Sequence, residues 1–178
     1  MSLIPSVYVH RVYEISPEEM KKNGVKLLFL DYDNLLVKHG SDDMDERTAA
    51  WLNEVRAAGI LTVILSNNVK GRSYDFAQRH GIPVYAFSIK PLPHNYCRAM
   101  KAYGCRKEEC LAAGDTVVTD VFGAHAAGIG SVLCDPLSDQ DNLFGSVFRL
   151  WEKMVLAFWK KKGVFEKGAY YGKEDLQV

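Results

Sequence analysis

The sequence predicts an α/β fold: a doubly wound, parallel, five-stranded sheet with helices on both faces. Two observations lead to this prediction. Short runs that are apolar at nearly every position, such as residues 26–31 and 61–65, indicate strands that are buried on both faces. These runs alternate with segments of helical periodicity about ten residues long, which is the order expected for parallel strands joined by right-handed crossovers.

The elements follow one another in a regular order. Ser16 and Pro17 mark the start of a short first helix, because serine caps helix N-termini and proline suits the first turn, and Asn23 with Gly24 ends it. The remaining predicted elements are a strand at 26–31, a helix at 45–58, a strand at 61–65, a helix at 69–80, a strand at 84–87, a helix at 94–103, a strand at 110–113, a helix at 118–127 and a last strand at 131–134.

Length and composition indicate one globular domain with a terminal extension. The chain has 178 residues, of which 48% are hydrophobic and 25% charged. We expect a domain over 1–141, with its core at about 25–134, and a C-terminal helix and tail over 142–178. Lys and Arg together number 22, as do Asp and Glu. This balance speaks against a general nucleic-acid binder, which would need a basic surplus.

The sequence also predicts a cytoplasmic protein without a membrane span. Its longest apolar runs are strand-sized, well short of the roughly 20 residues that a spanning helix needs, and its first ten residues do not resemble a secretory signal. The four cysteines contain no CxxC spacing, so we expect thiols rather than disulfides or a metal site.

Polar side chains follow four of the predicted strands at the point where each strand ends. In doubly wound sheets, ligands bind at the carboxyl ends of the strands. The residues found there are Asp31, Asp33 and Asn34 after the first strand, Ser66 and Asn67 after the second, Lys90 just beyond the third, and Asp115 with Asp120 after the fourth.

These residue types suit phosphoryl transfer. Two carboxylates about 4 Å apart repel by about 4 kcal/mol at an effective dielectric of 20, so Asp31 and Asp33 need a cation or a proton between them. Asp115 and Asp120 add acid to the same edge, and oxygen ligands favour Mg²⁺ over zinc. Ser66, the following backbone N–H groups and Lys90 are groups that hold phosphoryl oxygens.

The order of these motifs resembles the haloacid dehalogenase (HAD) superfamily of phosphatases over about residues 25–134. The motifs are Asp-x-Asp at 31–33, Ser-Asn at 66–67, Lys-Pro at 90–91 and Gly-Asp-x-x-x-x-Asp at 114–120. Asp-x-Asp-Asn, Ser-Asn-Asn and Gly-Asp-x-x-x-Thr-Asp-Val are similar to the YqeG-type subclass IIIA phosphatases, a family that includes phosphatidylglycerophosphate phosphatases.

This resemblance implies a role for each motif residue. Asp31 would be the nucleophile that forms an aspartyl-phosphate, and Asp33 would protonate the leaving oxygen and then activate water. Lys90 would neutralise the intermediate. Residues implied to bind phosphate are Ser66, Asn67 and Asn34, and those implied to hold Mg²⁺ are Asp31, Asp33, Asp115 and Asp120. Leu35 departs from the pattern, since the family usually has a threonine there.

The spacing between motifs leaves no room for a cap domain. Residues 34–44 provide only a loop, and the stretch from Ser66 to Lys90 is used by one helix and one strand. A pocket without a cap is open to solvent, so we expect a large substrate: a lipid head group, a protein or a nucleic-acid end. Of the histidines, His39 in the first loop is the one we single out as a substrate contact.

The C-terminal segment combines an apolar stripe with basic residues. Apolar side chains recur at helical spacing, at Phe144, Val147, Phe148, Trp151, Met154, Val155 and Phe158. Residues 149–167 carry six basic and two acidic side chains. The stripe could pack on the sheet, or the helix could lie on an anionic membrane surface, and the two can hold together. A place peripheral to the inner face of the membrane would follow from the second.

The leading hypothesis is a Mg²⁺-dependent phosphatase that converts phosphatidylglycerophosphate to phosphatidylglycerol. One alternative keeps the chemistry but has a soluble phosphoprotein, nucleotide or sugar phosphate as substrate. Another is a phosphoryl-accepting signalling module without turnover, similar to a receiver domain. Receivers place the phosphoacceptor at the third strand, where this chain has Phe87 and Ser88.

Overall fold

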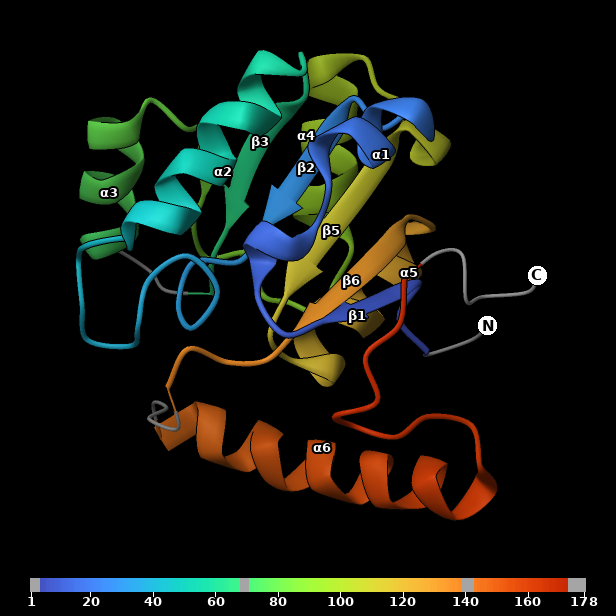
Figure 1. Cartoon of the computed structure of the whole chain (residues 1–178). Coiled ribbons are helices and arrows are strands. Elements are labelled where there is room, and N and C mark those ends of the chain that lie inside the picture. Colours follow the sequence, from blue (N-terminus) through green and yellow to red (C-terminus); the bar gives the residue numbers. More distant parts are fainter. Residues whose placement is uncertain (1–3, 68–70, 139–142, 173–178) are drawn as a thin grey trace.

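The computed structural model describes residues 4–67, 71–138 and 143–172, with side chains in the last helix described from Leu150 onward. Within these residues the fold is a parallel six-stranded sheet in the order β1-β6-β5-β2-β3-β4 (Figure 1). The α/β class, the parallel sheet and the absence of an inserted cap among the described residues agree with the sequence prediction.

The elements have the following bounds. The strands are β1 (Val7–Val9), β2 (Leu27–Leu30), β3 (Leu61–Leu65), β4 (Val84–Tyr85), β5 (Cys110–Gly114) and β6 (Gly130–Cys134). The helices are α1 (Pro17–Lys22), α2 (Glu46–Ala57), α3 (Arg72–His80), α4 (His94–Tyr103), α5 (Phe122–Ala127) and α6 (Leu143–Lys162), and the short turns are η1 (Val12–Glu14), η2 (Lys107–Glu109) and η3 (Val117–Val121).

All five predicted strands are present, but the count of five was wrong. The sixth strand, β1, is only three residues long and pairs with β6 at the edge of the sheet, with Val7 opposite Val132. A three-residue strand carries too little alternation to be recognised, and its partner lies more than 120 residues away. β4 is shorter than predicted because Phe87 has a φ of 50°, which ends the extended conformation.

The sheet is the middle of three layers. On one face, Leu28, Leu30 and Ile64 pack beneath α1, α2 and α3. On the other face, Phe29 and Val63 pack against α4 and α5. Because successive strand residues point to opposite faces, both faces are apolar, as the uninterrupted hydrophobic runs predict.

The helix predicted at 118–127 is divided in the structure. A π-helical turn, η3, comes first, and the α-helix α5 starts only at Phe122. Wider turns of this kind occur often at functional sites, and η3 carries Asp120. The cap of α1 is as predicted, since the Ser16 side chain accepts a hydrogen bond from the backbone N–H of Glu19 at 3.2 Å.

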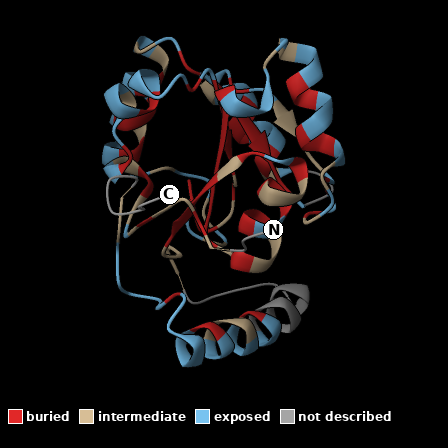
Figure 2. Ribbon diagram, turned by 90° about the vertical axis from the view of Figure 1, so that its right-hand side faces the viewer, coloured by how far each residue is buried: buried red, intermediate tan, exposed pale blue. Residues whose placement is uncertain are grey.

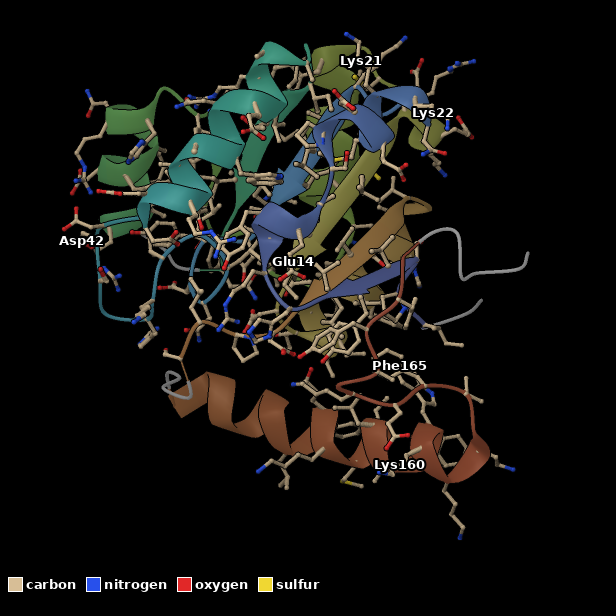
Figure 3. The ribbon with its side chains drawn as sticks, viewed as in Figure 1. Glu14, Lys21, Lys22, Asp42, Lys160 and Phe165 are labelled. Carbon is tan, nitrogen blue, oxygen red and sulfur yellow. The ribbon has the colours of Figure 1, made fainter. Side chains whose placement is uncertain are left out.

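Helix α6 lies beyond the carboxyl-terminal edge of the sheet (Figure 1). Trp159 anchors it, packing with Tyr8, Leu133 and Phe165, and Figure 3 shows Phe165 between α6 and the sheet. The apolar stripe packs on the rest of the fold only in part, because Trp151 and Phe158 are 62% and 58% exposed. Phe144, Val147 and Phe148 lie outside the described side chains. Among the described residues, no helix is both long enough and apolar enough to span a bilayer.

Candidate active site

Three carboxylates meet at the carboxyl ends of β2 and β5. Asp31 follows β2 directly, and Asp115 follows β5 directly. The two strands are parallel neighbours, with Leu30 opposite Ala113, and the backbone N–H of Asp31 donates to the carbonyl of Ala113 at 3.0 Å. Strand pairing therefore places residues 84 positions apart side by side.

Asp120 reaches the same place from η3. One carboxylate oxygen from each of Asp31, Asp115 and Asp120 lies within 4.8 Å of the other two, and Asp115 and Asp120 are each 3% exposed. The backbone N–H of Thr116 donates to Asp120 Oδ2 at 3.1 Å, which holds the carboxylate in place. Three of the four acids predicted to hold Mg²⁺ are thus brought together by two strands and one turn.

Lys90 lies among these acids. Its Nζ is 2.7 Å from Asp31 Oδ1 and 2.6 Å from Asp120 Oδ1, and its side chain is 3% exposed. Burial opposes the charge on Lys90, but Asp120 and Asp31 outweigh it and raise the pKa of the ammonium above its ordinary value. Lys90 is therefore a permanent cation at the centre of the site.

Burial also opposes the charge on Asp31, and here it outweighs the neighbouring cation. It raises the pKa of the carboxyl to about 7, even though Lys90 lowers it, and the charge of Asp120 adds to the increase. Three carboxylates and one ammonium leave an excess of negative charge. This all-oxygen donor set fits a hard divalent cation such as Mg²⁺.

Asn67 holds the backbone of Lys90. The Lys90 N–H donates to Asn67 Oδ1 at 2.7 Å, and Asn67 Nδ2 donates to the Lys90 carbonyl at 3.3 Å. Asn67 was predicted to bind phosphate, and the structure adds this positioning contact. Ser66, buried at the end of β3, is held through its backbone by Tyr85 and Ser88.

Asp33 is not one of the three carboxylates that lie within 4.8 Å of one another. Its Oδ1 is 3.6 Å from His39 Nδ1 and 3.7 Å from Arg72 Nη1. The prediction that Asp33 shares an ion with Asp31 assumed an extended chain, and it stays a prediction. The chain turns after Asp33, with Asn34 at a φ of 62°, and the Asp33 carboxylate lies beside His39 of the loop and Arg72 of α3. His39 thus lies beside Asp33, and a contact of His39 with the substrate stays a prediction.

Asn34 and Leu35, which the sequence also singles out, lie in the loop after β2. Asn34 Oδ1 accepts hydrogen bonds from the His39 N–H at 3.2 Å and from Ser138 Oγ at 2.7 Å. Those bonds tie the loop to the segment after β6, and a phosphate contact by Asn34 stays a prediction. Leu35, where the pattern usually has threonine, is 2% exposed and packs in the core.

Sequence reasoning missed Arg72 and Glu152. Arg72 Nε binds Asp42 at 2.5 Å, which holds the long loop against α3 and places the guanidinium beside Asp33. Glu152 is 2% exposed and its Oε1 accepts from the backbone N–H of Val117, the first residue of η3, at 2.9 Å. An acid within a basic amphipathic helix was the only signal for Glu152.

The topology and the acidic site together define a class of protein. The sequence model of the haloacid dehalogenase-like hydrolase family matches residues 8–128 of this chain. The chain therefore belongs to this family of hydrolases. It is an enzyme with the family's motifs at the strand ends where the sequence predicts them.

Curated relatives extend this likeness over most of the chain. It is 31% identical over 160 residues to "Probable phosphatase YqeG" of Bacillus subtilis (strain 168), covering 90% of this chain and 93% of that protein. It is 26% identical to phosphatidylglycerophosphate phosphatase 1 of Chlamydomonas reinhardtii and 27% identical to that of Arabidopsis thaliana. The matches cover 90% and 91% of this chain but only 64% and 49% of those two proteins.

Solved structures share the fold. The cobalt-bound deoxy-D-mannose-octulosonate 8-phosphate phosphatase of Haemophilus influenzae matches with a TM-score of 0.53 and 18% identity, over 83% of this chain and 96% of that one. An uncharacterized protein of Listeria monocytogenes serotype 4b matches with a TM-score of 0.50 and 17% identity, over 77% and 99% of the two chains.

Proposed function

We propose that this hydrolase is a Mg²⁺-dependent phosphatase that cleaves a phosphomonoester through an aspartyl-phosphate on Asp31. The observation that carries the proposal is the Lys90 ammonium, held within 2.7 Å of Asp31 and Asp120 at a rim with an excess of carboxylates. Phosphoryl transfer needs positioning and charge neutralisation, which this arrangement supplies.

The residues account for both half-reactions. In the first, an Asp31 oxygen attacks phosphorus, the bond to the leaving oxygen breaks, and Asp33 gives that oxygen a proton. In the second, Asp33 takes a proton from the attacking water, the bond between phosphorus and Asp31 breaks, and inorganic phosphate leaves. Lys90 stabilises the charge on Asp31 and the phosphoryl group, while Ser66 and Asn67 orient its oxygens.

Asp31, Asp115 and Asp120 would hold the Mg²⁺, which would neutralise charge on the transferred phosphoryl group. We leave Asp33 out of this set, because its carboxylate faces His39 and Arg72. His39 and Arg72 are placed to keep Asp33 oriented and to meet negative charge on the substrate.

The proposed substrate is the head group of phosphatidylglycerophosphate at an anionic membrane surface, with phosphatidylglycerol as product. Two relatives are named as phosphatidylglycerophosphate phosphatases, which supports a lipid substrate. An active site without a cap domain also suits a head group that is presented by a bilayer. Among the described residues, no observation favours a phosphoprotein, a nucleotide, a sugar phosphate or a receiver-like role over this one.

The test is phosphate release from a soluble aryl phosphate and from vesicles containing phosphatidylglycerophosphate, each with Mg²⁺ or EDTA. We expect Mg²⁺-dependent multiple turnover that Asp31→Asn abolishes. Asp43→Asn is the matched control, because the Asp43 side chain is 89% exposed and lies outside the carboxylate group. Wild-type rates in Asp31→Asn would disprove the mechanism. Turnover of soluble phosphates but not of vesicles would disprove the lipid substrate alone.

A further inference from the structure

From Leu150 onward, helix α6 has an inner face that packs on the rest of the fold. Trp159 is 8% exposed within its aromatic cluster, and Glu152 is 2% exposed at its bond to the Val117 N–H. Val117 begins η3, which carries Asp120. The helix is thus fixed to the turn that supplies an acid of the site.

Over residues 150–162, the opposite side of the helix is apolar and exposed to solvent. Leu150, Trp151, Met154 and Phe158 are between 58% and 64% exposed, and their spacing of three and four residues places them on one side. In Figure 2, the part of α6 that is coloured by burial is pale blue, and so exposed, along the side that points away from the sheet. We call these four side chains the outer face of α6. Large apolar side chains gathered in this way mark an interaction surface.

The charge around the outer face is basic. Lys153, Lys161 and Lys162 are exposed, and Lys162 Nζ lies 5.8 Å from the centre of the Phe158 ring. Lys160, labelled in Figure 3, forms an ion pair with Glu166, with 2.5 Å between Nζ and Oε1. Within residues 150–162, the described acid is Glu152, and it is buried on the inner side. The surface therefore offers apolar and cationic groups together, without an exposed carboxylate on the helix.

We propose that the outer face of α6 docks the enzyme on a bilayer surface that carries anionic lipids. Trp, Met, Leu and Phe side chains enter the boundary between head groups and acyl chains, and the adjoining lysines meet the lipid phosphates. The proposal rests on the proposed function, because it names the surface through which the enzyme reaches a lipid substrate. Helix α6 lies at the carboxyl-terminal edge of the sheet, the edge that bears the active site (Figure 1).

Charge argues against a second copy of the chain as the occupant. A two-fold contact places the same patch on both sides, so pairing two outer faces would bring lysines against lysines with no carboxylate of these faces between them. An anionic lipid surface supplies the missing negative charge.

The test is co-sedimentation with vesicles of phosphatidylcholine alone or with phosphatidylglycerol added. These vesicles contain no phosphomonoester, so binding is measured independently of turnover. We expect at least tenfold stronger binding to the anionic vesicles. We also expect binding to weaken in 1 M salt, where the Debye length falls to about 3 Å. Equal binding to both vesicles, or none to either, would overturn the proposal.

Substitutions on the outer face of α6 test whether this face is the surface that binds the vesicles. The double substitution Trp151→Ser with Phe158→Ser should reduce anionic-vesicle binding at least tenfold, and Lys161→Gln with Lys162→Gln should reduce it and flatten its salt dependence. Leu61→Ser is the matched control, because Leu61 is 47% exposed at the amino-terminal end of β3 and should leave binding unchanged. Thermal unfolding midpoints confirm that each variant is folded.

Three results would contradict the assignment. They are full binding by both double variants, an equal loss in Leu61→Ser, and concentration-dependent dimers that the Trp151 and Phe158 substitutions abolish. Failure of docking with retained turnover of phosphatidylglycerophosphate would overturn this surface alone. Docking without any phosphatase activity would overturn the proposed function instead.

Discussion

Gly114 leaves the space that the Asp120 side chain occupies. A Cβ atom on Gly114 would lie 2.2 Å from Asp120 Cγ and 2.4 Å from Oδ2, far inside van der Waals contact. Glycine is needed here for this close approach rather than for an unusual φ. The last residue of β5 thus allows a carboxylate from η3 to lie against the backbone and reach Lys90.

We expect Gly114→Ala to displace the Asp120 carboxylate and to lower kcat/KM at least 100-fold, since a shift of about 1 Å at a catalytic group can have that effect. Half-saturation by Mg²⁺ should move to higher concentration, which a Mg²⁺ titration of aryl phosphate hydrolysis measures. Gly172→Ala is the matched control, because its added Cβ meets nothing within 4 Å. Unchanged Mg²⁺ dependence in Gly114→Ala would contradict this role.

The raised pKa of Asp31 predicts how stability depends on pH without divalent cations. Since the pKa of Asp31 is about 7 in the folded state and 3.8 for an ordinary aspartic acid, the folded protein binds more protons than the unfolded chain between these pH values. Stability should therefore fall as pH rises from about 4 to about 7. Thermal unfolding in EDTA should show this decrease, and Asp31→Asn should reduce it.

Mg²⁺ should offset this decrease, because it removes the cost of ionising a carboxyl that is buried beside other acids. We expect Mg²⁺ to raise the midpoint of thermal unfolding more at pH 7.5 than at pH 5, by several degrees for a stabilisation of 1–2 kcal/mol. The same midpoint shift at both pH values, or an equal shift in Asp31→Asn, would show that the cation does not bind through Asp31.

The fold was predictable because its signals are local. Uninterrupted apolar runs marked the strands that position Asp31 and Asp115, and the order of those strands followed from general rules of α/β topology. β1 was missed because pairing with β6, not its own three residues, makes it a strand. The two-sided character of α6 was missed for the same reason, since only the packed fold shows that Trp159 points inward and Trp151 outward.

The candidate site was likewise predictable only in part. Strand-end acids and Lys90 could be named from motif order, but their supports could not. Asn67 binds the Lys90 backbone across 23 residues, and Arg72 reaches Asp33 and Asp42 from α3. Such contacts depend on how loops fold over the sheet, which no spacing in the sequence encodes.

The loop that carries Lys90 holds a strained residue. Ile89 has a φ of 50°, a conformation that β-branched side chains rarely adopt, and it is 50% exposed. Ile89→Gly should therefore stabilise the protein by about 1 kcal/mol, measured by urea unfolding. Leu92→Gly is the control: Leu92 is similarly exposed at 55% and is not among the positive-φ residues. A loss of stability in Ile89→Gly equal to that in Leu92→Gly would contradict the strain.

The bond between Glu152 and Val117 predicts a dependence of catalysis on α6 that is separate from membrane docking. Glu152→Leu leaves the buried Val117 N–H without this acceptor, which should destabilise the fold by about 1–3 kcal/mol. Because Val117 begins the turn that carries Asp120, kcat/KM on a soluble phosphate should fall as well.

Glu152→Gln is the informative partner, since its amide oxygen can still accept the hydrogen bond from Val117. We expect it to retain most of the stability and activity that Glu152→Leu loses, measured by urea unfolding and by aryl phosphate hydrolysis in the absence of lipid. If the two substitutions behaved alike, the negative charge of Glu152 and not its hydrogen bond would hold η3. If neither lowered kcat/KM, the position of Asp120 would not depend on α6.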